Sequence, residues 1–476
     1  MRTLSRMLKA AVSSRPHRKA VRKMIILKDE KSYNACILEL KKFGITPVKQ
    51  VGSANMLCCH MDGNHHALQR LRKHPSVRRI ETDARVRAHI YPLSYYPASQ
   101  ILNSVTAEPT SSKQIPWGVK RIQAPEVWKS SQGKSIKVAV VDTGISAHPD
   151  LNIAGGVNTI RKGGSYRDDN GHGTHVAGIV AALGKSGMQY GVAPEVILYA
   201  VKVLDQSGDG YVSDIVEGLE WCIRNNMDVI NMSLGLNGAS ASLRSMVKRA
   251  HRKGIVIVSS AGNEGRNSGK IDQPASYPEV IAVAATDKNN RIASFSSRGR
   301  GIDVAAPGSD IVSTSNKQGF ITNSGTSMAA PHVSGTAALL LAHNRKVKPS
   351  LIRKLLMDTA RPLNGYSRHS QGSGLIQADR AFSSLSIAAQ QEAEASEGFE
   401  SAHSTPAIPI QAAAASRHKH RSKVLVIRRR NRQRAVRHSQ AVVPRHSSIG
   451  AKSTSAAHRK RQVQRRRRVS TNPSIM

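Results

Sequence analysis

Three separated segments of the chain carry the residue types that a serine nucleophile requires. They are Val141-Asp142-Thr143-Gly144, Asn170-Gly171-His172-Gly173-Thr174-His175 and Gly325-Thr326-Ser327-Met328-Ala329. A serine hydroxyl is a poor nucleophile at neutral pH, so an imidazole must take its proton and a carboxylate must hold that imidazole in the right tautomer. The three segments therefore predict nucleophilic catalysis by Ser327, with Asp142 as the carboxylate and a histidine of the second segment as the base.

Each of these residues also has a structural interpretation. Asp142 could cap the turn before Gly144, because it follows an apolar run that is typical of a buried strand. Ser327 could be a helix N-cap, since a small and apolar stretch follows it. His172 and His175 could be a metal pair on one helix face, but the glutamate of His-Glu-x-x-His is missing, so this is the weaker alternative.

The order Asp, His, Ser along the chain is that of subtilisin, and residues 115–381 resemble the subtilisin family. The matching strings are residues 137–145, 170–178, 259–265 and 324–335. The resemblance implies a serine endopeptidase with the catalytic residues Asp142, His172 and Ser327, and with Asn263 as the side-chain donor of the oxyanion hole. It further implies protein substrates, no catalytic cofactor, and synthesis as a self-processing proenzyme.

The resemblance also assigns the residues that hold the substrate. An extended peptide is expected to pair with Ser233, Leu234 and Gly235, while Ser260, Ala261 and Gly262 wall the pocket for P1, the residue before the scissile bond. Asp272 matches the base of this pocket and Glu264 lies near its mouth. A buried carboxylate favours a cationic partner, so we expect Lys or Arg at P1. The alternative is that Asp272 lies in a solvated loop.

Members of the family often bind structural calcium. Asp150 matches one ligand position, but the loop of residues 183–189 contains Lys185, and Lys113 lies near the N-terminal ligand position. Because lysine is not a calcium ligand, a strong calcium site is not expected. An ammonium bridge to Asp150 is the alternative.

The pattern of apolar residues predicts the elements that position these groups. Strand-length apolar runs at residues 136–141, 196–204, 228–234, 255–258 and 280–284 alternate with helical stretches at residues 174–183, 213–226, 242–253 and 326–343. Such alternation indicates an α/β fold with a parallel sheet flanked by helices. Asp142 and Asn263 follow strands, at the carboxyl edge where reactive groups of such sheets gather.

Composition, apolar periodicity and the resemblance together predict five parts: a basic leader (1–22), a small α+β domain (23–90), a linker (91–113), the catalytic domain (114–385) and a tail (386–476). The string of residues 74–83 resembles the end of the subtilisin propeptide, which implies that the small domain is an intramolecular inhibitor. The alternative is an appended domain of unrelated purpose. Self-cleavage is expected within the linker or at its ends, with Tyr91 favoured by alignment and Lys113 by the pocket charge.

The tail carries much of the positive charge of the chain, whose formal net charge is +40. It contains 19 Lys and Arg residues against 4 Asp and Glu residues, without apolar periodicity, so it is predicted to be disordered. Such a polycation is expected to bind nucleic acid or another anionic polymer without sequence specificity. The alternative is a solvated tail that has no dedicated partner. A second hypothesis for the whole chain is therefore an anionic-polymer-binding protein whose protease core is silent.

The cysteines, the N-terminal segment and the apolar segments of the chain give expectations about its compartment and assembly. Its four cysteines do not form a disulfide framework. The first 23 residues are basic and lack an apolar core, so a secretory signal is not expected, and no segment is long and apolar enough to cross a membrane. We expect a monomeric, cytoplasmic bacterial enzyme. A mitochondrial presequence and non-classical export are the alternatives.

Overall fold

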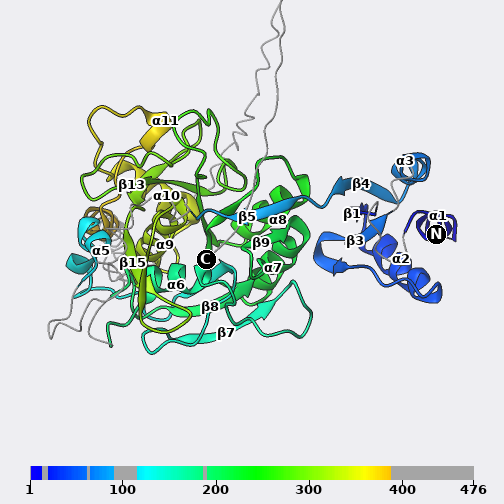
Figure 1. Cartoon of the computed structure of the whole chain (residues 1–476), viewed down its shortest axis with the longest axis horizontal. Coiled ribbons are helices and arrows are strands. Elements are labelled where there is room, and N and C mark those ends of the chain that lie inside the picture. The colour runs from blue at the N-terminus through cyan, green and yellow to red at the C-terminus, as the bar shows by residue number, and fades with distance from the viewer. Residues whose placement is uncertain (1, 13–19, 62–64, 91–114, 186–189, 388–476) are drawn as a thin grey trace, which may run out of the picture. The chain divides into compact units, whose positions relative to one another are not determined.

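The structure is a computed structural model that describes residues 2–12, 20–61, 65–90, 115–185 and 190–387 (Figure 1). The expected linker lies wholly outside these residues, and so does the expected tail apart from residues 386–387. Among the described residues, no helix is long and apolar enough to span a membrane. All four cysteines are described, buried and free.

A seven-stranded sheet forms the centre of the larger domain, and every strand pairs with its neighbours in parallel. The order along the sheet is β14 (Val304–Pro307), β13 (Ile281–Thr286), β12 (Val256–Ser260), β10 (Val229–Met232), β6 (Lys137–Asp142), β8 (Ile197–Lys202) and β7 (Ile153–Asn158). The middle strands are buried on both faces, which explains their nearly continuous apolar sequences. The expected α/β fold is confirmed.

Helices cover both faces of this sheet (Figure 1). Val138 and Val140 of β6 belong to the apolar cluster that contains residues of α6 (His172–Ala181) and α9 (Thr326–His343). The intervening Ala139 and Val141 belong to the cluster of α7 (Val212–Arg224) and α8 (Ala241–Arg252). Because successive side chains of a strand point to opposite faces, these clusters define two layers of helices around one sheet.

The remaining elements of the larger domain are short or lie at its borders. They are α5 (Trp117–Arg121), η3 (Ala124–Val127), β9 (Asp209–Tyr211), β11 (Leu234–Gly235), β15 (Ile311–Thr314), β16 (Phe320–Asn323), α10 (Pro349–Asp358) and α11 (Arg368–Gln371). Strands β15 and β16 pair antiparallel, and α6 packs against β15. This hairpin therefore supports the helix that begins at His172.

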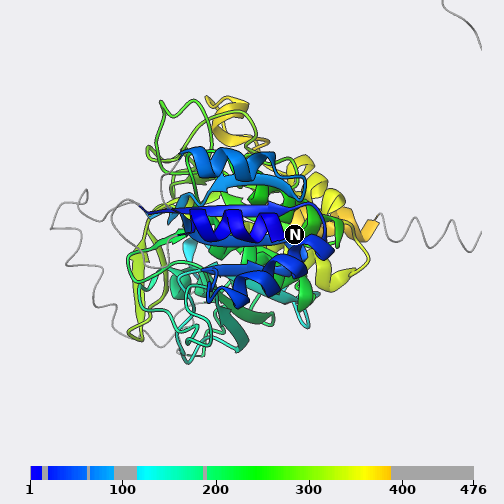
Figure 2. The same ribbon diagram turned by 90° about the vertical axis from the view of Figure 1, so that its right-hand side faces the viewer.

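The N-terminal domain is a four-stranded antiparallel sheet with helices on one face (Figure 2). Its strands are β1 (Val21–Leu27), β2 (Lys49–Val51), β3 (Met56–Met61) and β4 (Val77–Thr82), and its helices are α1 (Arg2–Ala11), α2 (Glu30–Lys42) and α3 (His65–Lys73), with the 3-10 turn η1 (Gly52–Ala54). Met24 and Ile26 of β1 face away from the helices and join the cluster of α7 and α8. The free face of this sheet is thus covered by the larger domain.

The first helix differs from the expectation of a separate basic leader. Leu4, Leu8 and Ala11 of α1 are buried in the same cluster as Ile25 of β1. The apolar positions recur at helical spacing between basic residues, so one stripe of α1 packs onto α2 and α3. The described part of the leader therefore belongs to the N-terminal domain.

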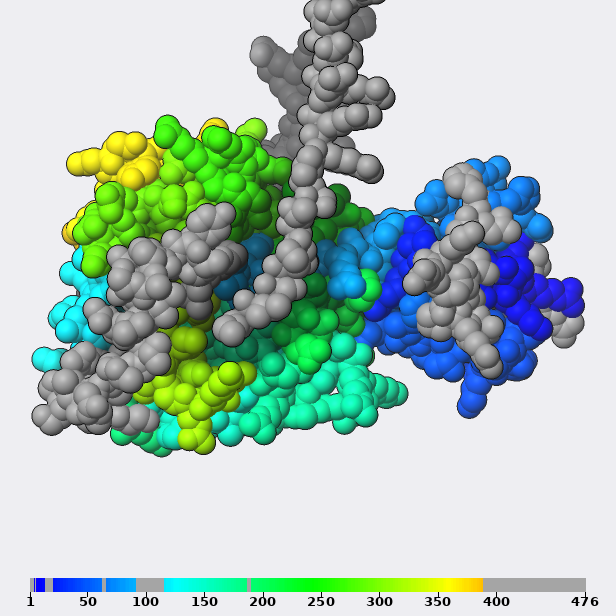
Figure 3. All heavy atoms as spheres, in the orientation of Figure 1, coloured from blue at the N-terminus to red at the C-terminus, as the bar shows by residue number. Residues whose placement is uncertain are grey.

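A short strand, β5 (Arg85–Ala88), leads out of the N-terminal domain into the larger one. It lies between β11 and β9 and pairs antiparallel with both. Figure 3 shows the light-blue residues of this segment entering the green surface of the larger domain. The polypeptide that follows the N-terminal domain thus fills a groove of the larger domain.

Candidate active site

Asp142 is the last residue of β6 and is fully buried. Its Oδ1 accepts hydrogen bonds from Nδ1 of His172 at 2.7 Å and from the backbone N of Thr143 at 2.7 Å. A proton on Nδ1 leaves Nε2 of His172 as the basic nitrogen of the ring. The carboxylate is therefore placed to select the tautomer in which His172 can accept a proton.

The turn before α6 holds His172 through Asp168, a residue that the sequence analysis did not select. The Asp168 carboxylate accepts from the backbone N of Gly171 and Thr174 and from the hydroxyls of Thr143 and Thr174, at 2.6–2.9 Å. It thereby satisfies free amides at the start of the helix. The signal in the sequence is an Asp shortly before Asn-Gly-His, a pattern typical of a capping turn.

Ser327 lies in the first turn of α9, and its side chain is fully buried. Its hydroxyl donates to the backbone O of Ser233 at 2.8 Å, and Nε2 of His172 is buried without a hydrogen-bond partner. Pro331 has no N–H for the carbonyl of Ser327 four residues earlier, and that carbonyl instead accepts from Oγ of Ser233 at 2.9 Å. Oγ of Ser327 would therefore have to turn away from the carbonyl of Ser233 for His172 to act as its base.

Asn263 follows β12 in a glycine-rich turn, where its side chain is fixed from one side. Its Oδ1 accepts from the backbone N of Thr326 at 3.0 Å and from Oγ1 of Thr326 at 2.9 Å. Its Nδ2 donates to the backbone O of His89 at 2.7 Å. The amide is therefore oriented by the first residues of α9 so that its N–H group points at the carbonyl that ends the N-terminal segment.

Glycine at position 325 makes room for this carbonyl. A Cβ at this residue would lie 2.4 Å from the O of His89, and the backbone φ of +155° lies at the limit of the region that favours glycine. The carbonyl of His89 thus fits between Gly325 and Asn263, beside the backbone amides that begin α9. Free amides and the positive end of a helix dipole are suited to stabilise an oxyanion at this position.

The backbone of residues 85–89 lies along the groove as a peptide substrate would. The N of His89 donates to the O of Ser233 at 3.2 Å, and Ala88 and Arg87 are registered against Leu234 and Gly235. The structure therefore brings Ser233, Leu234 and Gly235, which the sequence predicts to hold the substrate, next to the extended backbone of residues 87–89.

The imidazole of His89 occupies a buried polar pocket. Its Nδ1 lies 2.7 Å from Oγ of Ser260, and its Nε2 lies 3.0 Å from Oδ2 of Asp272. Asp272 is 7% exposed, so it lies at a buried end of the pocket rather than in a solvated loop. Gly235 forms one wall, because a Cβ there would lie 2.5 Å from the imidazole.

Among the other predicted pocket residues, Ala261 and Gly262 are buried next to Ser260. The carboxylate of Glu264 accepts a hydrogen bond from the hydroxyl of Ser297, which also accepts from the backbone N of Glu264. Glu264 is exposed, and its hydrogen bonds are to Ser297 rather than to His89. Asp272 is therefore the carboxylate that contacts the residue in the pocket.

A buried network beneath Ser327 was also missed from the sequence. Asn231 donates from Nδ2 to Oγ of Ser233 at 2.9 Å and accepts at Oδ1 from Oγ of Ser334 at 2.8 Å. This links β10 to α9 next to Ser327. An Asn inside the apolar strand Val-Ile-Asn-Met is the available signal, because a buried amide must find partners.

Two further histidines are buried near the site. Nε2 of His175 lies 3.0 Å from the carbonyls of both Ile311 and Ile321, and Nδ1 of His332 donates to the carbonyl of Met328 at 2.8 Å. Burial lowers the pKa of His175 to about 3 and that of His332 to about 4. Both are therefore neutral structural residues, which excludes His175 from a charged role beside His172.

The surroundings of Asp150 do not form a metal site among the described residues. The carboxylate of Asp150 accepts a hydrogen bond from the backbone N of Lys185. The described residues contain no group of three or more His, Cys, Asp or Glu side chains that could hold a metal ion. Lys113 and its expected bridge to Asp150 lie outside the described residues.

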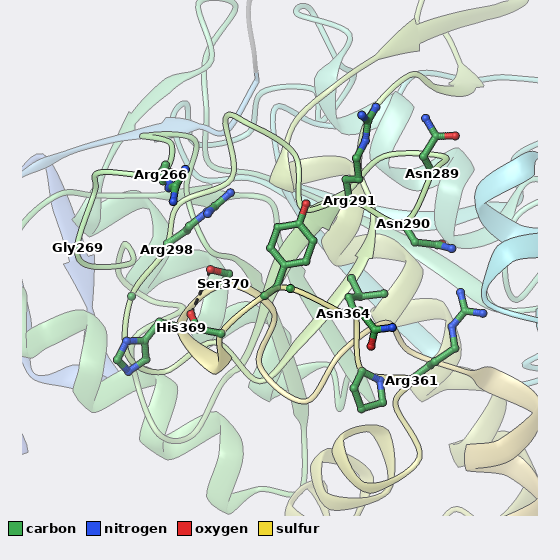
Figure 4. Close-up of a pocket in the computed structure, with 16 residues that line it drawn as sticks. Arg266, Gly269, Asn289, Asn290, Arg291, Arg298, Arg361, Asn364, His369 and Ser370 are labelled. Atoms are coloured by element: carbon green, nitrogen blue, oxygen red, sulfur yellow. Dashed lines mark hydrogen bonds between the residues drawn. The ribbon is translucent and has the colours of Figure 1, made fainter.

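A cavity of about 1100 Å³ lies elsewhere on the larger domain. Figure 4 shows four arginines among the residues that line it: Arg266, Arg291, Arg298 and Arg361. Its lining includes none of Asp142, His172, Ser327 and Asn263. The groove near Ser327 is already occupied by residues 85–89, so the catalytic candidates lie there rather than in this cavity.

Comparisons with known proteins identify the family of the chain. The model of the Subtilase family matches residues 133–374. The chain is 47% identical over 271 residues to Subtilisin Savinase of Lederbergia lenta, covering 57% of this chain and 99% of that protein. It is 42% identical over 323 residues to a thermostable alkaline protease of Halalkalibacterium halodurans, covering 68% and 82%. An alkaline protease of Shouchella clausii is 46% identical over 286 residues, covering 60% and 74%.

Proposed function

The chain belongs to the subtilase family and is a subtilisin-like serine endopeptidase, and we propose that it hydrolyses peptide bonds through Asp142, His172 and Ser327. The observation that carries this proposal is the hydrogen bond of 2.7 Å from Nδ2 of Asn263 to the carbonyl of His89. It supports an oxyanion hole that already holds a peptide carbonyl. Subtilases need no catalytic cofactor, so the protein groups alone perform the reaction.

In the proposed reaction, Oγ of Ser327 attacks the carbonyl carbon of the substrate while Nε2 of His172 takes the hydroxyl proton. Asp142 keeps the proton on Nδ1 and stabilises the imidazolium that forms. The tetrahedral oxyanion is held by Nδ2 of Asn263 and the backbone N of Ser327. His172 then protonates the leaving amine, and a water molecule repeats the sequence on the acyl-enzyme.

The N-terminal domain acts as an intramolecular inhibitor that ends in the active site. Strand β5 supports this role, because it pairs with β11 and β9 and delivers His89 to the pocket. The geometry favours the His89–Ile90 bond as the self-processing site. Tyr91 and Lys113, the two processing positions predicted from the sequence, lie outside the described structure.

The pocket prefers a cationic residue at P1. The contact of 3.0 Å between Asp272 and the imidazole of His89 supports this preference, because a buried carboxylate is stabilised by a protonated partner. Lys and Arg would place their charge at the same end of the pocket. The processing segment then presents a histidine, which fits the pocket and carries a positive charge only when it is protonated.

A fluorophosphonate probe tests the proposed nucleophile directly. The processed protein should be labelled at Ser327, and Ser327→Ala should abolish both labelling and hydrolysis of a protein substrate. Asp142→Asn should retain Ser327 but react much more slowly, since His172 loses its orientation. A folded, processed protein that resists the probe would support the alternative of a silent protease core.

A further inference from the structure

A second carboxylate faces the segment that fills the substrate groove. Asp209 is the first residue of β9 and is registered opposite Arg87. Its Oδ1 lies 2.8 Å from Nε of Arg87, and its Oδ2 lies 3.5 Å from Nη2 of the same guanidinium. Nη1 of Arg85 lies 3.6 Å from Oδ2. One carboxylate thus binds two arginines that are two residues apart.

The alternation of β5 explains why both arginines reach Asp209. Arg85 and Arg87 lie on one side of the strand, whereas Val86 and Ala88 are buried on the other side in the cluster that contains Leu234. With His89 at P1, Arg87 occupies P3 and Arg85 occupies P5. The apolar side of the strand packs against the larger domain, and the arginines of the other side bind the carboxylate of Asp209.

The neighbouring acid of this loop does not share the role. Oδ1 of Asp205 accepts from the backbone N of Ser207 at 2.8 Å and of Asp209 at 3.2 Å, so it closes its own turn. Asp209 is 17% exposed as a side chain, while the two arginines are 63% and 77% exposed. With the two arginines in place the Asp209 carboxylate is largely covered, so the larger domain supplies the negative charge and the peptide supplies the cations.

We infer that Asp209 is a specificity-determining residue that selects a cationic side chain at P3 and, more weakly, at P5. This inference rests on the proposed function, because it takes residues 85–89 as the mimic of a substrate. Asp272 reads P1 from a separate pocket, so the two preferences act independently. The substrate class is then a peptide with Lys or Arg at alternate positions, as at Lys419, Arg421 and Lys423 of the chain itself.

Partial exposure of the arginines limits the size of the effect. An ion pair of this kind changes affinity by about three- to fivefold, and added salt weakens it. The bidentate contact with Arg87 places most of this gain at P3 rather than P5. The preference at P3 should therefore be measurable as a ratio of kcat/KM values, and it should fall as ionic strength rises.

The test compares two fluorogenic peptides that differ only at P3. Arg-Val-Arg-Ala-Lys and Arg-Val-Gln-Ala-Lys, each carrying a coumarin amide after Lys, are assayed with the processed enzyme, with Asp209→Asn and with the control Asp205→Asn. We expect the wild type and the control to prefer Arg at P3 by about three- to fivefold. The ratio should fall to near one in Asp209→Asn, and Asp209→Lys should invert the preference when Glu replaces Gln at P3.

Three outcomes overturn the inference. A wild-type ratio near one, or an unchanged ratio in Asp209→Asn, would show that P3 charge is not read by Asp209, while hydrolysis itself would leave the proposed function intact. If a processed enzyme hydrolyses neither peptide and resists the fluorophosphonate probe, the proposed function is wrong, and the inference fails with it.

Discussion

The carbonyl oxygen of His89 lies 2.7 Å from Nδ2 of Asn263, although 174 residues separate the two along the chain. Asn263 is fixed by Thr326 at the start of α9, and His89 is fixed by the pairing of β5 with β11. The relationship places the end of the N-terminal domain where a peptide carbonyl would become an oxyanion. The same contact therefore supports both proposals: that Asn263 is an oxyanion-hole donor and that the N-terminal domain inhibits the protease.

Replacing Asn263 by Ala should lower kcat far more than it changes KM. The amide donates to the oxygen that becomes negatively charged, so its loss should cost about a hundredfold to a thousandfold in kcat, the range known for this donor in subtilisin itself. Steady-state kinetics on a peptide substrate measure this. Thr326→Val removes only one hydrogen bond that orients the amide, so a smaller loss is expected. An Asn263→Ala enzyme of full activity would contradict the oxyanion role.

Replacing Asp272 by Asn should remove the preference for a cation at P1. The carboxylate is buried, so a lysine or arginine in the pocket gains a charged partner that leucine cannot use, and we expect the preference to fall by about tenfold or more. A panel of peptides that differ at P1 gives the ratio. Glu264→Gln is the matched control, because Glu264 bonds to Ser297. Faster cleavage after Leu than after Arg by the wild type would refute the charge preference.

Replacing Lys49 by Met should weaken the hold of the N-terminal domain on the protease. Nζ of Lys49 lies 3.0 Å from Asp214 and 2.9 Å from Glu217 of α7, and only 8% of its side chain is exposed. Its loss would leave the buried Asp214 without its salt-bridge partner and with Arg22 as the remaining nearby cation, at a cost of up to about 3–5 kcal/mol. Activity should then appear earlier after processing in a time course. Lys42→Met, at an exposed pair within α2, should behave as the wild type.

The two buried histidines should make the folded protein less stable in mild acid. Burial lowers the pKa of His332 to about 4 and of His175 to about 3, so between these values and about 6.5 the unfolded chain binds more protons than the folded one. Stability is therefore present above pH 6.5 and is lost as pH falls, by about 1.4 kcal/mol per pH unit for each histidine.

Urea unfolding of the Ser327→Ala chain at pH 7 and pH 5 measures this effect without self-digestion. Adding His332→Gln should weaken the pH dependence of the free energy of unfolding, because about one proton fewer is bound on unfolding. His369→Gln, at an exposed position, should leave this dependence unchanged. An equal pH dependence in all three proteins would show that His332 is not held neutral in the fold.

Much of the fold could be predicted from the sequence because its core elements are strongly patterned. Helix α9 begins and ends at the predicted residues 326 and 343, and the buried strands β6, β12 and β13 lie within two residues of their predicted ranges. Strand β7 was missed, since its Ile-Ala-Gly-Gly-Val-Asn sequence is a weak strand signal at the edge of the sheet. Helix α1 was missed because its apolar stripe is narrow among basic residues.

Some residues of the candidate site could be predicted from local sequence, and others could not. Asp142, His172, Ser327 and Asn263 stand in long, specific strings, so their identity could be predicted before any geometry was known. The position of His89 could not, because it depends on pairing β5 with β9 and β11, which lie more than 120 residues further along the chain. Asp209 was missed for the same reason. Its role depends on register across strands, which no local pattern records.

The mature ends of the chain test the central claim most directly. Intact-mass and N-terminal analysis of the purified protein should find a fragment that ends at His89 and a protease that begins at Ile90. The Ser327→Ala chain should stay uncut at this bond. A wild-type chain that remains intact while folded, or a cut at His89–Ile90 that persists in Ser327→Ala, would contradict the account.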